Sequence, residues 1–335
     1  APIDGGVAGR HLTPSRHDSL PTSMGSDIND MLDRWGPDHC EQVSPDAAMA
    51  YCRSLTLGHY ENFSVLSRFV PERLRDGVSA VYAYCRWADD LADEAGDPAI
   101  ATERLLWWRK ELADCFEGNP RHPVFVALAD VIERYELIRT PFDRLLDAFE
   151  QDQEQDRYET WDDLMFYCSG SADPVGHLVL KMSGEDMDES QILASNAVCS
   201  GLQLANHWQD VRRDAVERNR IYIPRDMMDV PDFESRLLST ARMGHAPDWE
   251  FLAAYRSVIA ELMERTRPML LQVVPLMASV RPDLRPMLFL FAAGGSSTLD
   301  AIQRCGHETV LYRVSLSKFR KLWLLWLASR QRHAA

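Results

Sequence analysis

The chain has 335 residues, of which 46% are hydrophobic and 26% charged, and its formal net charge at pH 7 is -15. A chain of this length and composition is typical of a globular protein with one large core or two smaller ones. The negative charge disfavours binding to nucleic-acid phosphates, so we expect no nucleic-acid partner. An anionic ligand would have to be met by local arginines or by a bound metal ion.

The N-terminal segment, residues 1–30, is polar and rich in Gly, Ser, Pro and Asp, and we expect it to be disordered. It shows no continuous apolar stretch of the kind found in signal peptides. The seven cysteines are scattered, without CxxC pairs or zinc-site spacing, which indicates packing thiols in a reducing compartment. These features favour a cytoplasmic protein.

The periodicity of apolar residues from residue 31 to residue 330 predicts one all-α domain, because nearly every patterned stretch repeats at i, i+3, i+4 and i+7. Pro, Gly and Asp mark the breaks. The predicted helices are Pro45–Leu57, His59–Phe69, Arg75–Glu94, Ala99–Phe116, Pro123–Glu136, Pro141–Gln153, Thr160–Ser169, Pro174–Met182, Glu189–Val216, Asp232–Ala241, Asp248–Thr266, Arg267–Ala278, Pro282–Cys305 and Leu311–Arg330.

An acidic cluster lies on the helix predicted for Arg75–Glu94. Asp89 and Asp93 are four residues apart and share a face, with Asp90 and Arg86 beside them. Like charges at this spacing cost a helix about 0.2–0.5 kcal/mol per pair, which implies a neutralising cation. A single cluster of this kind is more often a solvated, salt-bridged face.

A second cluster on Glu189–Val216 changes this balance. Asn206, Asp210 and Asp214 repeat at four-residue intervals, and Gln203 precedes them by one turn. Hard oxygen ligands favour Mg²⁺, which takes one or two carboxylates and completes its shell with water and phosphate oxygens. The candidate metal ligands are Asp89, Asp90, Asp93, Asn206, Asp210 and Asp214, and the flanking cations for phosphate are Arg212, Arg213, Arg218 and Arg220.

The order of these motifs resembles the squalene and phytoene synthase family, over roughly His59 to Pro224 with a weaker tail to about Leu325. The motifs are Arg86-x-x-Asp-Asp-x-x-Asp-Glu, Asp152-Gln-x-x-Asp156-Arg157-Tyr158, Tyr167-Cys168, Gln203-x-x-Asn206-x-x-x-Asp210-x-x-x-Asp214 and Arg220-Ile-Tyr222-Ile-Pro224. Two local stretches, His59 to Val65 and Ser171 to Gly176, are similar to the bacterial hydroxysqualene synthase branch of the hopanoid pathway.

The resemblance implies a class I isoprenoid synthase fold, with a central cavity whose mouth lies between the two acidic helices. It implies Mg²⁺ held by the aspartates, and a catalytic set of Asp89, Asp93, Asp210, Asp214 and Tyr82. The substrate-binding set it implies is His59, Asn62, Phe63, Arg86, Arg157, Tyr158, Gln203, Asn206, Arg220 and Tyr222. The expected reaction ionises presqualene diphosphate and captures the rearranged cation with water, giving hydroxysqualene.

Three positions depart from the family pattern. Gln209 replaces a common Arg, Glu61 stands where a basic residue is common, and Asn62 where Ser is common. These changes weaken the case for a second bound diphosphate and favour a single-substrate reaction. The spacing from Asp214 to Arg220 is also one residue longer than expected, so Arg218 and Arg220 could exchange roles.

Two alternatives for the function stay open. One is a head-to-head prenyltransferase that makes presqualene diphosphate or phytoene from two prenyl diphosphates. The other is a non-catalytic helical partner subunit of such a synthase, although the intact aspartate pairs argue against it. A di-iron bundle is disfavoured because no Glu-x-x-His pair occurs at the clusters. Other enzymes of the hopanoid pathway are the expected protein partners.

The basic and Trp-rich stretch from Lys318 to Leu327 has two interpretations. It packs as a last core helix, or it lies on the inner face of the membrane as a peripheral contact. Its apolar run, Leu322 to Ala328, is far shorter than the roughly 20 residues that span a bilayer.

Overall fold

The computed structural model describes residues 28–58, 68–185 and 187–331. All regular elements in these ranges are helices. Two isolated bridges, Trp35 with Cys40 and Arg157 with Ile221, are the only extended pairings that these residues make. The all-α prediction is confirmed, and all seven cysteines are free thiols.

Most predicted helices are present within a few residues of their expected ends. The elements are α1 Ile28–Trp35, α2 Pro45–Gly58, the 3-10 turn η1 Glu72–Leu74, α4 Arg75–Asp93, α5 Pro98–Phe116, α6 Pro123–Tyr135, α7 Thr140–Gln151 and α8 Trp161–Ser171. They continue as α9 Asp173–Ser183, α10 Glu189–Glu217, η2 Arg225–Met227, α11 Phe233–Met243, α12 Trp249–Leu271, α13 Val273–Ser279, α14 Arg285–Arg304 and α15 Lys318–Gln331.

Side-chain caps explain why many helices start where they do. Thr160 and Asp163 form a capping box at the start of α8, and Asp188 and Gln191 form one at the start of α10. The Asp97 side chain accepts a hydrogen bond from the Ala99 amide at the start of α5, where Pro98 occupies the first turn. These are local signals, so the sequence reveals them directly.

Four predictions about the elements need comment. Helix α1 was not predicted, and it begins at Ile28, inside the segment expected to be disordered; Ile28 and Trp35, which are both buried, hold this short helix at its two ends. The predicted helix His59–Phe69 lies mostly outside the described residues. The break predicted after Thr266 is wrong, and the helix predicted for Leu311–Arg330 is present but begins later, at Lys318.

Helix α12 continues through Pro268 to Leu271 because tertiary contacts hold it in place. The Thr266 hydroxyl accepts a hydrogen bond of 2.9 Å from the Trp208 indole of α10, and Leu270 is buried one turn later. Residues 311–317 are not helical because contacts with α10 capture them: the Gln209 side chain donates to the Val314 carbonyl at 2.7 Å.

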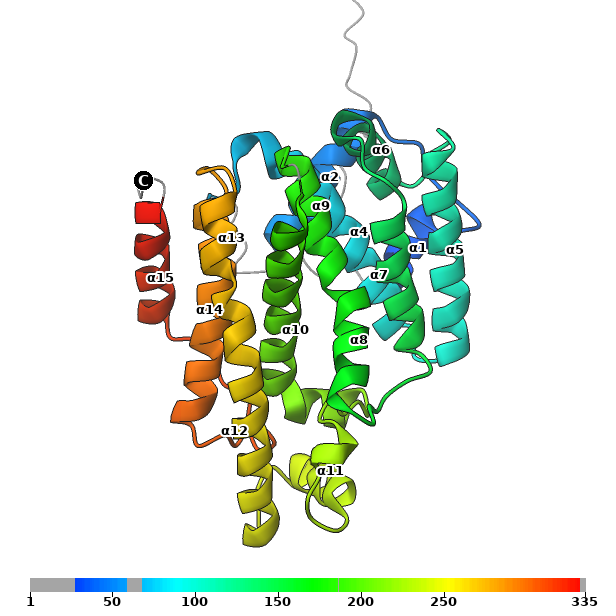
Figure 1. Cartoon of the computed structure of the whole chain (residues 1–335). Helices are drawn as coiled ribbons and strands as arrows, with labels where there is room; N and C mark the ends of the chain where they lie inside the picture. The colour runs from blue at the N-terminus through cyan, green and yellow to red at the C-terminus, as the bar shows by residue number, and fades with distance from the viewer. Residues whose placement is uncertain (1–27, 59–67, 186, 332–335) are drawn as a thin grey trace, which may run out of the picture.

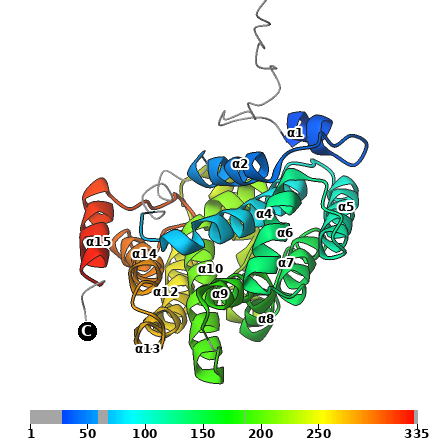
Figure 2. The same ribbon diagram turned by 90° about the horizontal axis from the view of Figure 1, so that it is seen from above.

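The two acidic helices lie in different halves of the bundle. Helix α4 packs against α2, α5 and α6, whereas α10 packs against α9, α12 and α14. Figures 1 and 2 show α10 near the middle of the bundle and α15 at its outer edge. No helix within the described ranges combines the length and the apolarity that crossing a membrane requires.

Large buried aromatics fix the rotation of both acidic helices. On α4, Trp87 stacks on Trp108 at 5.4 Å between ring centroids, and the Tyr84 hydroxyl donates to the Phe142 carbonyl at 2.9 Å. On α10, Trp208 is fully buried and is held by Thr266. Because these faces are committed to the core, the aspartates emerge on the remaining face of each helix.

Asp173 provides a test of this packing. Its side chain is buried on α9, where it accepts a 2.8 Å hydrogen bond from the Ser200 hydroxyl, and burial raises the pKa of Asp173 to about 6. The folded state therefore holds a proton that the unfolded chain releases near pH 4. The contribution of protonated Asp173 to the free energy of unfolding is fully present below pH 4. It is lost as pH rises through 6, by about 2–3 kcal/mol. Asp173→Asn should gain this amount over wild type between pH 4 and pH 8, measured by urea unfolding.

Asp162→Asn, at an exposed position in the first turn of α8, is the matched control and should show no such pH-dependent difference. A stability difference between Asp173→Asn and wild type that is constant from pH 4 to pH 8 would contradict the account.

Candidate active site

The aspartates of α4 and α10 meet at one place. The Arg218 guanidinium lies 2.6 Å from Oδ2 of Asp93 on α4 and 3.9 Å from Oδ1 of Asp214 on α10. Arg220 adds a second contact with Asp93, at 3.3 Å from Oδ1. We call Asp89, Asp93, Asp210 and Asp214 the carboxylate mouth.

The turn after α10 positions both arginines. Asn219 adopts a left-handed conformation with φ 53°, which reverses the chain, and the Arg220 amide donates to the Asp214 carbonyl at 2.9 Å. The Ile221 amide then donates to the Asp156 carbonyl at 3.0 Å. Arg218 and Arg220 therefore both contact Asp93, and Arg218 alone of these two also lies near Asp214.

The neighbouring aspartates Asp89 and Asp90 of the first cluster have different surroundings. Asp89 is half-buried and lies 3.3 Å from Arg86; its pKa is raised by burial and by the neighbouring Asp93. Asp90 is 5% exposed and accepts a 2.9 Å hydrogen bond from Nε of Arg86, while burial raises its pKa to about 7. Ligation of a metal by Asp90 would require this pair to open, so the structure associates Asp90 with Arg86 more closely than with the mouth.

The second cluster is more deeply buried. Arg213 lies 2.9 Å from Asp210 and 3.5 Å from Asp214. Oδ1 of Asp214 is buried and accepts no hydrogen bond from any described residue, and burial raises the pKa of Asp214 to about 6. We expected Arg212 at the site, but it points elsewhere: its guanidinium donates to the Ala241 carbonyl of α11 at 2.9 Å.

Arg313 is a site residue that the sequence did not indicate. Its guanidinium forms a bidentate pair with Asp210, in which Nη2 lies 3.4 Å from Oδ2. Arg313 belongs to the non-helical stretch before α15, 103 positions from its partner. No local pattern marks this arginine, so only the tertiary fold could reveal it.

An aromatic layer lies behind Arg220. The Arg220 guanidinium donates to the Asp152 carbonyl at 3.0 Å, and the Tyr167 hydroxyl donates to the Asp152 carboxylate at 3.1 Å. The His207 ring stacks on Tyr222 at 3.6 Å. Burial, together with the nearby Arg220, lowers the pKa of His207 to about 3, so its imidazole is neutral. Burial raises the pKa of Asp152 to about 7.

Tyr158 and Tyr222, both predicted to bind substrate, belong to this layer. Their rings stack with centroids 5.8 Å apart, and their exposures are 1% and 9%. Arg157 lies at the edge of the layer, where it donates to Glu234 of α11 at 2.6 Å and to the Asn219 carbonyl. Arg157 thus holds the turn that carries Arg218 and Arg220, and its substrate role stays a prediction.

The remaining predicted residues have different positions. Gln203 is half-buried and lies two turns before Asp210, and Asn206 is exposed and lies one turn before it, on the same face of α10. His59, Asn62 and Phe63 lie outside the described residues, as does Glu61.

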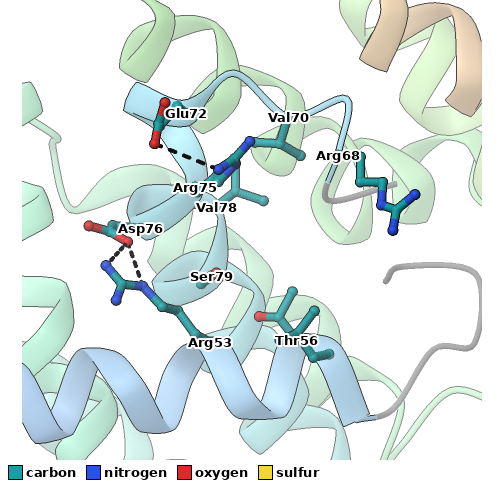
Figure 3. Close-up of a pocket in the computed structure, with 10 residues that line it drawn as sticks. Arg53, Thr56, Arg68, Val70, Glu72, Arg75, Asp76, Val78 and Ser79 are labelled. Atoms are coloured by element: carbon teal, nitrogen blue, oxygen red, sulfur yellow. Dashed lines mark hydrogen bonds and ion pairs between the residues drawn. The ribbon is translucent and has the colours of Figure 1, made fainter. Parts of the chain in front are cut away.

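A half-buried stripe on α4 connects the mouth to a pocket. Val78, Tyr82, Cys85, Asp89 and Asp93 lie on one face of the helix and are all of intermediate exposure, along roughly 22 Å from Val78 to Asp93 at about 1.5 Å per residue. The Val78 end lines a pocket of about 630 Å³ formed by α2, η1 and the start of α4. Figure 3 shows its charged rim, where Arg53 pairs with Asp76 and Arg75 with Glu72.

The carboxylate mouth, rather than this pocket, carries the charged chemistry. The carboxylates Glu72 and Asp76 in the pocket lining are already matched to arginines of their own. The mouth instead gathers two aspartates from each of two helices, and Arg218 lies between Asp93 and Asp214. We therefore take the mouth as the candidate active site.

The donor set of the mouth fits a hard divalent cation shared with a ligand. Within the described ranges no three acidic, His or Cys side chains converge to hold a metal ion by themselves. The carboxylates instead come in pairs, and Oδ1 of Asp214 is buried without a hydrogen bond. Mg²⁺ characteristically takes one or two carboxylates and fills its octahedral shell with water and phosphate oxygens. The arrangement suits that division.

Comparison with known proteins shows which families the chain is similar to. The profile of the squalene/phytoene synthase family matches residues 57–320. The chain is 35% identical to a hydroxysqualene synthase from Rhodopseudomonas palustris, over 73% of this chain and 90% of that protein. It is 27% identical to a phytoene synthase from Arthrospira platensis, over 83% and 91%. The crystal structure of squalene synthase HpnC from Alicyclobacillus acidocaldarius superposes with a TM-score of 0.68 at 39% identity, covering 78% of this chain and 95% of that one.

The helical fold and these matches place the protein among the isoprenoid synthases, enzymes of the all-α terpenoid synthase fold. The chain belongs to the squalene/phytoene synthase family. The family resemblance expected from the motifs is confirmed.

Removing Arg220 should show how much its ion pairs contribute to the free energy of unfolding. Its side chain is 11% exposed and pairs with Asp93 and Asp152, so Arg220→Met would leave the buried Asp152 without its ion-pair partner and Asp93 with Arg218 alone. We expect a loss of about 3 kcal/mol in the free energy of unfolding, measured in urea at pH 7.5. Arg225→Met is the control, because Arg225 is 46% exposed in its pair with Glu159 and should cost under about 1 kcal/mol. Equal losses in the two variants would show that the Arg220 pairs do not hold the site together.

Proposed function

We propose that this protein converts presqualene diphosphate to hydroxysqualene in a Mg²⁺-dependent reaction. The observation that carries the proposal is the meeting of two aspartate pairs from α4 and α10 at one mouth, bridged by Arg218. The similarity to the Rhodopseudomonas palustris hydroxysqualene synthase supports the choice within the family.

The proposed reaction breaks one carbon–oxygen bond and forms another. The bond from the cyclopropylcarbinyl carbon to the diphosphate breaks, and the electron pair leaves with the diphosphate. The cation then rearranges, water adds to it, and the water loses one proton. The products are hydroxysqualene, diphosphate and a proton, so no reductant is needed.

The leaving diphosphate needs charge neutralisation at the mouth. Mg²⁺ held by Asp89, Asp93, Asp210 and Asp214 would supply Lewis-acid stabilisation of that charge. Arg218 and Arg220 lie beside Asp93, and Arg313 lies beside Asp210, so their guanidiniums are placed to contact phosphate oxygens when the carboxylates are otherwise compensated. Fixed cations aimed at developing charge are the main source of catalysis in such a site.

The half-buried stripe on α4 indicates where the hydrocarbon part of the substrate would lie. From the mouth it leads past Cys85 and Tyr82 to Val78 at the pocket of about 630 Å³. We place the isoprenoid chain along this stripe, with Tyr82 presenting its ring to the carbocation, since an aromatic face stabilises a cation without quenching it.

A head-to-head prenyltransferase is the second candidate, and the similarity to the phytoene synthase of Arthrospira platensis favours it. Such an enzyme must bind two prenyl diphosphates at once. Membership of an enzyme family leaves the third alternative, a non-catalytic partner subunit, without support.

The deciding experiment compares substrates. Purified protein with Mg²⁺ is incubated with presqualene diphosphate and, separately, with farnesyl or geranylgeranyl diphosphate, and extracted products are identified by mass spectrometry. We expect hydroxysqualene from the first substrate and no turnover of the others. Presqualene diphosphate or phytoene formed from prenyl diphosphates alone would establish the prenyltransferase instead.

Neutralising one aspartate on each helix should remove metal-dependent binding and turnover together. Asp93→Asn and Asp214→Asn should each lower kcat by about 100-fold or more. They should also abolish the Tm rise that Mg²⁺ with inorganic diphosphate gives wild type, about 5 °C at about 100 times Kd. Asp226→Asn, exposed on η2, is the control and should retain both. A full thermal shift in both mouth variants would contradict the metal assignment.

Filling the Val78 end of the stripe should affect the hydrocarbon and not the diphosphate. Val78→Trp should lower kcat/KM for presqualene diphosphate by about 10-fold or more through overpacking, while the thermal shift with Mg²⁺ and inorganic diphosphate is unchanged. Val274→Trp, at a position on α13 that is 64% exposed, is the matched control. Unchanged kinetics in Val78→Trp would show that the chain runs elsewhere.

A further inference from the structure

Helix α15 lies on the outside of the bundle, beside α14 (Figures 1 and 2). Its inward face is narrow: Leu324 and Ala328, 4% and 0% exposed, form a small cluster with Leu290 of α14. Neither the core-helix interpretation nor a free tail describes this helix fully, because it is docked along one edge only.

The outward face of α15 is apolar. Phe319, Leu322, Trp323 and Trp326 are 84%, 62%, 46% and 54% exposed, and their spacing of i, i+3, i+4 and i+7 puts them on one side of the helix. This reverses the usual pattern, in which the apolar face of a surface helix turns inward. Four large side chains gathered in this way mark an interaction surface.

The charge of α15 is opposite to that of the chain. Residues 318–331 contain Lys318, Arg320, Lys321 and Arg330 and no acidic residue, whereas the whole chain carries a net charge of -15. Arg320 pairs with Asp300 of α14 at 3.6 Å. No carboxylate of the described residues lies within ion-pair distance of Lys318, Lys321 or Arg330. The surface therefore presents cations together with its apolar side chains.

Two arginines lie over the exposed indoles. The Arg320 guanidinium is 4.5 Å from the Trp323 ring centroid, and that of Arg330 is 4.9 Å from the Trp326 ring. Tryptophan has an apolar ring and a polar N–H group, so it is suited to the boundary between acyl chains and lipid headgroups. A cation beside the indole can contact the anionic headgroups there.

We propose that α15 is a docking helix for an anionic lipid surface, lying in the interface plane with Phe319, Leu322, Trp323 and Trp326 inserted. The positive charge of α15 favours an anionic lipid surface over a second copy of the chain. A second copy of the chain meeting α15 across a two-fold axis would bring the same basic side chains together, whereas anionic headgroups complement them. The proposal is independent of the proposed reaction, since it rests on α15 and α14 alone.

The test uses the full-length protein and lipid vesicles in a flotation assay. Wild type should bind vesicles of phosphatidylcholine mixed with phosphatidylglycerol, and should bind pure phosphatidylcholine at least about 10-fold more weakly. The double variant Phe319→Ser/Trp326→Ser should lose binding to the mixed vesicles by about 10-fold or more. Trp249→Ser, at a tryptophan of α12 that is 72% exposed, is the matched control and should bind as wild type.

Circular dichroism and turnover of the double variant in detergent-free buffer establish that it is folded. Absence of wild-type binding to the mixed vesicles, or equal binding to both lipid compositions, would overturn the proposal. A dimer in sedimentation velocity that the double variant abolishes, without vesicle binding, would instead assign the surface to self-association.

Discussion

The site depends on one electrostatic constraint: carboxylates gathered at the facing ends of α4 and α10 must be neutralised for the two halves of the bundle to stay together. Arginines meet this requirement in the structure. Arg218 and Arg220 reach Asp93 from the turn after α10, and Arg313 reaches Asp210 from the stretch before α15. Several irregular features of the fold, including the left-handed Asn219 and the non-helical residues 311–317, serve to bring these guanidiniums to the mouth.

Burial around the mouth also controls which groups carry charge. His207 is neutral within the aromatic layer, because burial and the nearby positive charge of Arg220 both lower its pKa. Asp90 and Asp152 are shifted toward their protonated forms by the same loss of water. A dry, aromatic surrounding strengthens the remaining charge interactions, and in the proposed reaction it would keep stray water from the carbocation. The walls of the site therefore help to set the charge state of the groups at the mouth.

The sequence predicted what short-range patterns encode. Most helices, the two acidic clusters and the family resemblance follow from spacing along a few turns, as with Asp89 and Asp93 or the capped start of α10. It did not predict Arg313, whose partner is 103 positions away, or the direction of Arg212, which depends on where α11 lies. Helix α12 passes through Pro268 because Trp208 of another helix holds Thr266. In each case a tertiary contact overrides the local signal.

The single guanidinium of Arg218 lies beside aspartates of both acidic helices, and this shared position has a further consequence. Under the proposed function, a divalent cation and a diphosphate would depend on each other for binding at the mouth: the cation would release arginine from carboxylate, and the anion would give the released arginine a new counter-charge. Either one alone leaves a set of charges unmatched. By thermodynamic linkage each ligand would then raise the affinity for the other, so under the proposed function the mouth would bind the metal and the diphosphate together in preference to either one alone.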